Sequence, residues 1–235
     1  LARHADFGKL EPVYEALRRV RRELAPEIAL IGFCGAPWTV ATYMVAGQGS
    51  KDHAETRALA YSNPKKFGEL IDAITATTVD YLSKQIEAGV DAVQLFDSWA
   101  GSLSPAQFER WVIAPNAAIV SALRERHPDT PVIGFPKGAG AKLVAYAREV
   151  RPDALGLDET IDPVWANAAL PEGLPVQGNL DPLALMEGGE ALESAVARIL
   201  AAFENRPHIF NLGHGILQHT PIAHVEKLLN LVRGG

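Results

Sequence analysis

Short apolar runs alternate along the chain with longer segments whose apolar residues recur at helical spacing. Each run ends in glycine or a polar residue, which is typical of a buried strand followed by a loop. These runs predict six strands, over residues 28–35, 91–98, 131–137, 154–158, 174–180 and 208–214. Because helical segments separate them, the pattern predicts repeated strand-helix units.

Several helix starts are indicated by a capping residue directly before a proline. Asn63 precedes Pro64 and a long amphipathic segment that Gly89 stops. In this arrangement proline occupies the first turn, where its missing N–H costs nothing. Three more pairs repeat it, Ser104-Pro105, Asp181-Pro182 and Thr220-Pro221. An opening amphipathic helix is predicted by Leu10, Val13, Tyr14, Leu17, Val20 and Leu24.

Nearly continuous apolar strands joined by helices predict an α/β protein with a parallel sheet, either open and doubly wound or closed into a barrel. Polar residues at five strand ends favour the barrel, since an open sheet gathers its site at one switch point. They are Asp97, Ser98, Lys137, Asp158, Asn179, Asn211 and His214. A (β/α)8 barrel has eight strands in about 250 residues. We therefore expect residues 1–235 to form one barrel domain that carries strands three to eight, without the first two βα units.

Composition narrows the classes of function. The chain has 235 residues, 48% of them apolar, which is enough for one domain with a core. Its 22 Lys and Arg against 28 Asp and Glu give a net charge of −6 without a basic run, which argues against a nucleic-acid partner. No run of roughly 18 apolar residues could span a bilayer. A single cysteine, Cys34, indicates a soluble chain from a reducing compartment. The first residue is Leu1 and not Met, and no signal-peptide pattern follows it. We therefore expect the natural start of the protein further upstream.

Residues 31–51 are the densest in candidate chemistry. After the first strand, small residues predict a loop that exposes Trp38, Tyr43 and Met44. The Tyr43 phenol could meet a ligand, because a tyrosine ring packs while its O–H needs a partner. The alternative is a packed helix residue whose hydroxyl reaches solvent. The glycines that follow form no phosphate-binding motif.

The segment VQLFDSWAG ends the second predicted strand. Ser98 lacks the GxSxG context of a hydrolase nucleophile, so a hydrogen-bonding role fits it better. Asp97 is either a functional carboxylate or a loop carboxylate satisfied by nearby backbone N–H groups. At later strand ends, Lys137 could meet an anionic substrate or be solvated. Asp181 is best explained as a helix cap.

His214 lies between Gly213 and Gly215, just past the last predicted strand. The flanking glycines would let the imidazole approach a ligand closely, although a solvated loop histidine is the alternative. The other candidates lack this setting and are predicted at the surface, namely His208, His219 and His224. Cys34 is predicted to be a small buried residue, and no HxxxH or His-x-Cys arrangement supports a metal site.

Five segments, in this order, resemble motifs of the uroporphyrinogen decarboxylase family of the porphyrin pathway. They are GFCGAPWTVATYMV, QLFDSWAG, KGAG, QGNLDP and HIFNLGHGI. The resemblance implies a (β/α)8 barrel, a homodimer in the cytoplasm and no metal or organic cofactor. It also implies an activity, which converts the four acetate side chains of uroporphyrinogen III to methyl groups and gives coproporphyrinogen III.

The resemblance also assigns site residues. Tyr43, Ser98 and His214 fall on positions that contact the substrate in the family, and Tyr43 and His214 are the expected catalytic residues. Phe96 is similar to a family residue that packs on the macrocycle. The arginine-bearing segment and the pyrrole-binding aspartate of the family would lie before Leu1.

Three positions depart from the family pattern. Ala46 and Gln48 stand where the family usually reads TYMVEGGGS, and Glu159 stands where it usually has tryptophan after GLD. We expect these changes to alter loops at the rim more than the chemistry.

Two other classes stay open. A cobamide-dependent methyltransferase would share the barrel in a related family, but it needs a zinc-thiolate site and a His-x-Cys motif that the chain lacks. An inactive fragment or a non-catalytic scaffold is the second class, because an incomplete barrel exposes sheet edges.

Overall fold

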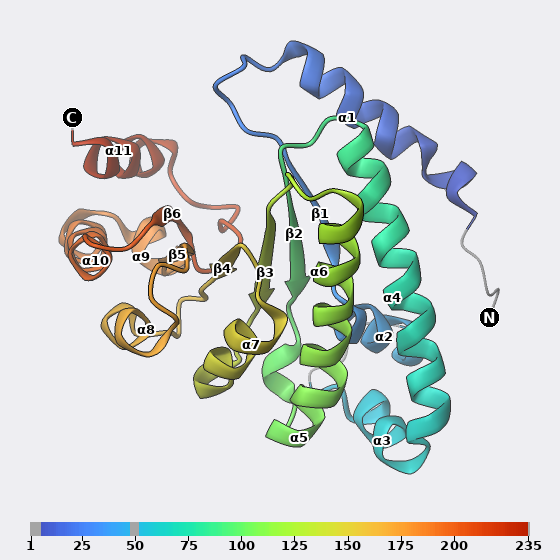
Figure 1. Ribbon diagram of the computed structural model, residues 1–235. Coiled ribbons are helices and arrows are strands. Elements are labelled where there is room, and N and C mark those ends of the chain that lie inside the picture. Colours follow the sequence, from blue (N-terminus) through green and yellow to red (C-terminus); the bar gives the residue numbers. More distant parts are fainter. Residues whose placement is uncertain (1–5, 48–51, 235) are drawn as a thin grey trace. The chain divides into compact units, whose positions relative to one another are not determined.

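The computed structural model describes residues 6–47 and 52–234. It confirms an α/β protein and divides the chain into two compact units, Leu1–Asp153 and Ala154–Gly235 (Figure 1). In both units the strands pair in parallel and helices follow them in the chain. None of the helices in the described residues is both long and apolar enough to cross a bilayer.

The first unit is built on three parallel strands. They are β1 (Ile31–Gly35), β2 (Ala92–Asp97) and β3 (Val132–Pro136), and β2 lies in the middle. Its helices are α1 (Glu11–Glu23), α2 (Pro37–Ala46), α3 (Ala54–Ser62), α4 (Pro64–Glu87), α5 (Pro105–Phe108), α6 (Ala114–Arg126) and α7 (Leu143–Val150). Short 3-10 turns cover Phe7–Leu10, Ala100–Ser102 and Gly140–Lys142, and a π-helical turn, Glu109–Ile113, joins α5 to α6. The long helices α4 and α6 run side by side (Figure 1).

The two faces of this sheet differ in what covers them. One face carries Cys34, Leu95 and Gly134 in one row, and a β-carbon on Gly134 would collide with Tyr146 of α7. This face is therefore packed closely against helices. The other face carries Phe33, which is 61% exposed.

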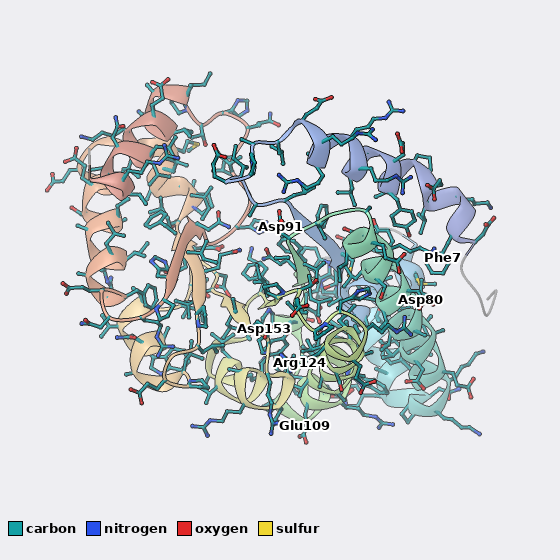
Figure 2. All side chains as sticks on the ribbon, turned by 45° about the horizontal axis from the view of Figure 1, so that its top comes forward. Phe7, Asp80, Asp91, Glu109, Arg124 and Asp153 are labelled. Atoms are coloured by element: carbon teal, nitrogen blue, oxygen red, sulfur yellow. The ribbon has the colours of Figure 1, made fainter. Side chains whose placement is uncertain are left out.

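Aspartates that precede strands anchor the end of the sheet at which the strands begin. Asp153 accepts hydrogen bonds from the backbone N–H of Val132 and from Arg124, whose guanidinium lies 3.0 Å from the Asp153 carboxylate (Figure 2). Asp91 accepts in the same way from the Leu30 N–H and from Arg21, both at 2.7 Å. These carboxylates tie strand starts to helices, at the end of the sheet away from the C-terminal strand ends.

The second unit repeats the arrangement. Its parallel strands are β4 (Ala154–Gly156), β5 (Val176–Leu180) and β6 (His208–Leu212), with β5 in the middle. Its helices are α8 (Pro163–Ala169), α9 (Pro182–Glu187), α10 (Gly189–Ala202) and α11 (Ile222–Arg233). Helix α10 contacts the other three helices of this unit and β5, so it forms the centre of the helical layer.

Of the four predicted pairs of a capping residue and a proline, two have the predicted side-chain cap. Asn63 caps α4 and Asp181 caps α9 through their side chains, as predicted. Ser104 directly precedes α5, as predicted, but its side chain does not cap the helix. Its hydroxyl lies 3.2 Å from the Tyr61 hydroxyl instead. The prediction at Thr220 is wrong, because Pro221 has an extended backbone and is itself the cap of α11.

The predicted loop after β1 is also wrong. Residues 37–46 form helix α2, and Trp38 is fully buried rather than exposed, whereas Tyr43 and Met44 are about half exposed. Helix α2 buries residues around most of its circumference, so its sequence lacks the one-sided pattern that predicts a surface helix. Gln48 and Gly49, at its end, lie outside the described residues.

Candidate functional site

The carboxylate of Asp97 forms the buried centre of the candidate site in the first unit. Asp97 ends β2 and is 1% exposed. Thr39 Oγ1 of α2 donates to its Oδ1 at 2.6 Å, and Asn116 Nδ2 of α6 donates to its Oδ2 at 3.4 Å. Burial raises the pKa of Asp97 to about 6, although the Thr39 and Asn116 hydrogen bonds act against this rise. The carboxylate is thus held by two helices, and not by its own loop.

The turn after Asp97 carries Ser98, which is partly buried. Trp99, the next residue, donates its backbone N–H to Thr39 Oγ1 at 3.2 Å. The Trp99 carbonyl accepts from the Trp38 indole N–H at 3.0 Å and from the Ser102 hydroxyl at 2.7 Å. These bonds fix the backbone of the turn at Trp99 and thereby limit where the Ser98 side chain can lie.

Tyr43 lies on α2, one helical turn after Thr39, and its side chain is 49% exposed. Its ring centroid is 6.4 Å from that of Trp99, and the His53 ring centroid is 4.8 Å from that of Trp99. Tyr43 is therefore a helix residue, as in the alternative interpretation of a packed helical tyrosine, and its ring remains accessible to solvent. The structure brings Tyr43 together with the turn that contains Ser98.

An aromatic row crosses the three strands of this unit. Phe96 lies between Phe33 and Phe135, with ring centroids 5.8 Å from each and nearly perpendicular ring planes. Of these three residues, the family resemblance marks Phe96 alone. The signal for the others is the period of two along parallel strands, which puts alternate residues of neighbouring strands on one face. The row provides an apolar surface, which is exposed at its Phe33 end.

In the second unit, two predicted polar residues connect loops. Asn179 Nδ2 at the end of β5 donates to the carbonyls of Asp158 and Ile161, at 2.9 and 2.7 Å. The Asp158 carboxylate accepts from both the backbone N–H and the hydroxyl of Thr160. Asp158 and Asn179 therefore hold the ends of β4 and β5 in place.

His214 follows β6 and is exposed. Gly213, before it, is buried against the Glu159 backbone and donates its N–H to the Leu180 carbonyl at 2.8 Å. Gly215, after it, has open space around the position of a β-carbon, because no described atom lies within 4 Å. The imidazole is thus carried by a loop whose first residue is fixed.

The surface prediction holds for His219 and is wrong for two other histidines. His208 is half-buried, with Nε2 2.6 Å from the Gly178 carbonyl and the ring packed near Phe203. Burial lowers the pKa of His208, and the hydrogen bond to Gly178 partly offsets this. His224 is also half-buried, because its Nδ1 lies 3.1 and 3.0 Å from two carbonyl oxygens of α9.

Cys34 is buried, as predicted, and burial raises the pKa of its thiol to about 12. Lys137 lies half-buried in the turn after β3, where its backbone N–H donates to the Asp97 carbonyl at 3.1 Å. Within residues 6–47 and 52–234, no three His, Cys, Asp or Glu side chains gather in a group that could hold a metal ion.

Comparison with solved structures identifies the class of fold. A methyltransferase from Methanosarcina mazei superposes with a TM-score of 0.81, covering 96% of this chain and 64% of that chain at 16% sequence identity. At this identity the likeness concerns the α/β fold alone.

Sequence comparison identifies the family. The family model described as "Uroporphyrinogen decarboxylase (URO-D)" matches residues 1–235. Curated proteins named uroporphyrinogen decarboxylase from Sphingopyxis alaskensis and Rhizorhabdus wittichii are each 69% identical over 227 residues, 97% of this chain and 66% of theirs. One from Novosphingobium aromaticivorans is 63% identical, over 97% of this chain and 67% of its own length. The chain belongs to the uroporphyrinogen decarboxylase family, which confirms the resemblance in its motifs, and it spans about two thirds of the length of these relatives.

Proposed function

We propose that the protein that contains this chain is a carboxy-lyase that removes CO2 from the four acetate side chains of uroporphyrinogen III and yields coproporphyrinogen III, in porphyrin biosynthesis. The observation that carries the proposal is the 69% identity to proteins of that name over 97% of the chain. The proximity of Tyr43 to the Ser98 turn supports it further, because both residues fall on substrate-contacting positions of the family.

The chemistry needs no electron sink beyond the substrate. Protonation of a pyrrole carbon next to the acetate arm creates an iminium, which takes up the electron pair when the C–C bond to the carboxylate breaks. CO2 leaves, a proton adds to the methylene carbon, and the ring proton is lost. In balance, one proton replaces one CO2 on each arm. The protein has to orient the arms, supply and remove protons, and stabilise the positive charge on the ring.

The residues of this chain can perform the orienting tasks. The Tyr43 and Ser98 hydroxyls would donate hydrogen bonds to carboxylate arms, and such charge-assisted bonds contribute about 1.5–3 kcal/mol each. Phe96 and its aromatic neighbours would pack on the macrocycle. In the second unit, His214 would donate to a further substrate group, and Tyr43 and His214 would hold or move protons. The resemblance assigns the carboxylate that faces the pyrrole N–H groups to a residue upstream of Leu1.

The architecture proposed for the whole protein is a (β/α)8 barrel in which β1 to β6 are strands three to eight. Six parallel-pairing strands in the described residues, each followed by helix, support it. The family resemblance further supports a homodimer in the cytoplasm. Light scattering of the purified protein at its natural length would give the mass of a dimer, and the mass of a monomer would overturn that part.

A cobamide-dependent methyltransferase is the second and less well supported candidate function. The methyltransferase of Methanosarcina mazei shares the fold at 16% identity, whereas the decarboxylases reach 69%. The sequence also lacks the His-x-Cys motif of a zinc-thiolate site. Stoichiometric zinc in the purified protein, with methyl transfer, would favour this reading.

The test is an anaerobic assay with uroporphyrinogen III in the presence of a chelator, following coproporphyrinogen. We expect turnover by the natural-length protein; a folded protein without turnover would overturn the proposal and favour a non-catalytic scaffold. Tyr43→Phe should lower kcat/KM about tenfold, the loss of one charge-assisted bond. Tyr61→Phe is the matched control, since Tyr61 is 59% exposed and its hydroxyl pairs with Ser104. Equal turnover of wild type and Tyr43→Phe would remove Tyr43 from the site.

A further inference from the structure

The hydroxyl of Thr39 connects both sides of Ser98. Thr39 Oγ1 donates to Asp97 Oδ1 at 2.6 Å and accepts from the Trp99 backbone N–H at 3.2 Å. Asp97 and Trp99 are the residues immediately before and after Ser98. One hydroxyl on α2 therefore fastens the chain at both neighbours of a substrate-contacting serine.

The direction of these two bonds is fixed by the chemistry of the groups. An ionised carboxylate can only accept, so the Thr39 hydroxyl hydrogen points to Asp97 and leaves a lone pair for the Trp99 N–H. Asn116 Nδ2 contacts the second oxygen of Asp97 at 3.4 Å and donates to the Val112 carbonyl at 2.8 Å. The carboxylate is thereby anchored to α6. A methyl group in place of the hydroxyl would satisfy neither Asp97 nor Trp99.

The same helix carries Tyr43, four residues after Thr39. Trp38, which precedes Thr39, donates its indole N–H to the Trp99 carbonyl at 3.0 Å. The Trp99 indole in turn packs beside the Tyr43 ring. Helix α2 and the Ser98 turn are thus joined by hydrogen bonds from two consecutive residues and by ring packing, all of which fix the spacing between the Tyr43 and Ser98 hydroxyls.

We infer that Thr39 is a positioning residue, which sets the placement of Ser98 relative to Tyr43 through its paired bonds to Asp97 and Trp99. The inference rests on the proposed function, since it assigns Thr39 a role in orienting the carboxylate arms. Thr39 itself is 6% exposed and has no need to touch the substrate. Removal of the Thr39 hydroxyl loosens the alignment of the substrate's carboxylate arm. Misalignment of reacting groups lowers the rate more than it weakens binding.

The test compares two buried threonines of α2 in the natural-length protein. Thr39→Val removes the bridging hydroxyl at nearly constant shape. Thr42→Val is the matched control, because Thr42 is 3% exposed and its hydroxyl donates to the Thr39 backbone carbonyl at 2.7 Å, away from the Ser98 turn. We expect both variants to fold and Thr39→Val to melt at the lower temperature, because it removes two hydrogen bonds, one of them to a buried carboxylate. Activities are therefore compared at a temperature at which both variants are fully folded. Thr39→Val should lower kcat about tenfold with little change in KM, and Thr42→Val should stay within about twofold of wild type.

Two further variants separate positioning from a general structural role. Thr39→Ser keeps the hydroxyl and should restore most of kcat. In a Ser98→Ala background, Thr39→Val should cost less than about twofold, because a residue that acts through Ser98 has little left to position. If Thr39→Val does not fold, Thr39→Ala, which cannot clash, replaces it in the same comparisons.

The outcomes distinguish the two proposals. An inactive wild type overturns the proposed function and this inference with it. An active wild type in which Thr39→Val and Thr42→Val lose equal activity overturns the inference alone. Full additivity of Thr39→Val and Ser98→Ala does the same.

Discussion

Gly213 lies so close to the backbone of Glu159 that a β-carbon on Gly213 would stand 2.2 Å from the Glu159 amide nitrogen. The Glu159 α-carbon would be 2.7 Å away. Both are backbone atoms, which cannot move aside as the end of a flexible side chain could. Because Gly213 also donates its N–H to Leu180, the loop that carries His214 is held between two strand ends. Position 213 therefore requires glycine, because there is no room for a β-carbon.

We predict that Gly213→Ala displaces the His214 loop and lowers decarboxylation. The alanine methyl group has to push the loop away from Glu159, and a shift of about 1 Å in a positioned group can cost up to about a hundredfold in rate. The kcat/KM for uroporphyrinogen should fall, and partly decarboxylated intermediates should build up. Chromatography of the products over time measures both effects. His214→Asn, which removes the imidazole itself, should give the same kind of product profile.

Gly215→Ala is the control for this prediction. It lies on the other side of His214, and a β-carbon there meets no described atom within 4 Å. The same added methyl group should therefore leave turnover close to wild type. Equal losses in Gly213→Ala and Gly215→Ala would show that loop flexibility, rather than the contact with Glu159, limits His214.

The buried Asp97 carboxylate predicts a pH dependence of stability. Burial raises its pKa from 3.8 to about 6, so the folded protein holds the Asp97 proton more tightly than the unfolded chain does. The protonated group favours the folded state at low pH, and this contribution is lost as the pH rises from about 4 through about 6. A shift of this size corresponds to about 3 kcal/mol in the free energy of unfolding.

The measurement is urea unfolding of wild type and of Asp97→Asn between pH 4 and pH 7. Asparagine does not titrate, so the difference between the two proteins isolates the Asp97 contribution from all other groups. We expect wild type to lose about 2.5 kcal/mol relative to the variant over this range, slightly less than the full shift because the unfolded carboxyl is already partly ionised at pH 4. Changes in hydrogen bonding to Thr39 and Asn116 add only a constant offset. A difference that stays flat with pH would contradict the raised pKa.

The strands could be predicted because each is a continuous apolar run that ends in glycine or a polar residue. The predicted ranges extend up to three residues beyond the observed strands. Three apolar residues, 28–30, precede the first paired residue of β1, Ile31, and the last predicted range also includes Gly213 and His214, which follow the end of β6 at Leu212. Helix α2 could not be predicted in this way. It is buried on most sides, so its apolar residues show no helical period.

The site could be predicted only at positions that a motif marks. The resemblance assigns a substrate contact to Tyr43 and to Ser98. Thr39 stands in the same segment as Tyr43 without such an assignment, and Asn116 stands in none of the matched segments. These two helix residues are 58 and 19 positions from Asp97 in sequence. No local pattern tells which helix residue will meet a given strand end. The same limit explains His208, which is half-buried through its contact with Gly178, 30 residues away.

Arg206 shows how one side chain holds a loop of the second unit. It is 9% exposed and contacts the loop after α8 and the turn that leads into β5. Its Nε donates to the Asn167 side-chain oxygen at 2.8 Å, and its terminal nitrogens donate to the carbonyls of Asn167, Leu170, Pro171 and Leu174 at 2.8–3.5 Å. The planar guanidinium reaches all of these acceptors at once.

We predict that Arg206→Lys lowers the free energy of unfolding by about 3 kcal/mol, because an ammonium group keeps the charge but cannot reach acceptors in the directions of a planar fork and leaves buried carbonyls unsatisfied. Urea unfolding followed by circular dichroism measures the change. Arg198→Lys is the matched control, since Arg198 pairs with Asp162 where both side chains are about half exposed or more. Solvent screens such a pair, so this variant should unfold nearly like wild type. Equal destabilisation by the two substitutions would mean that loss of a guanidinium, and not the buried position of Arg206, causes the effect.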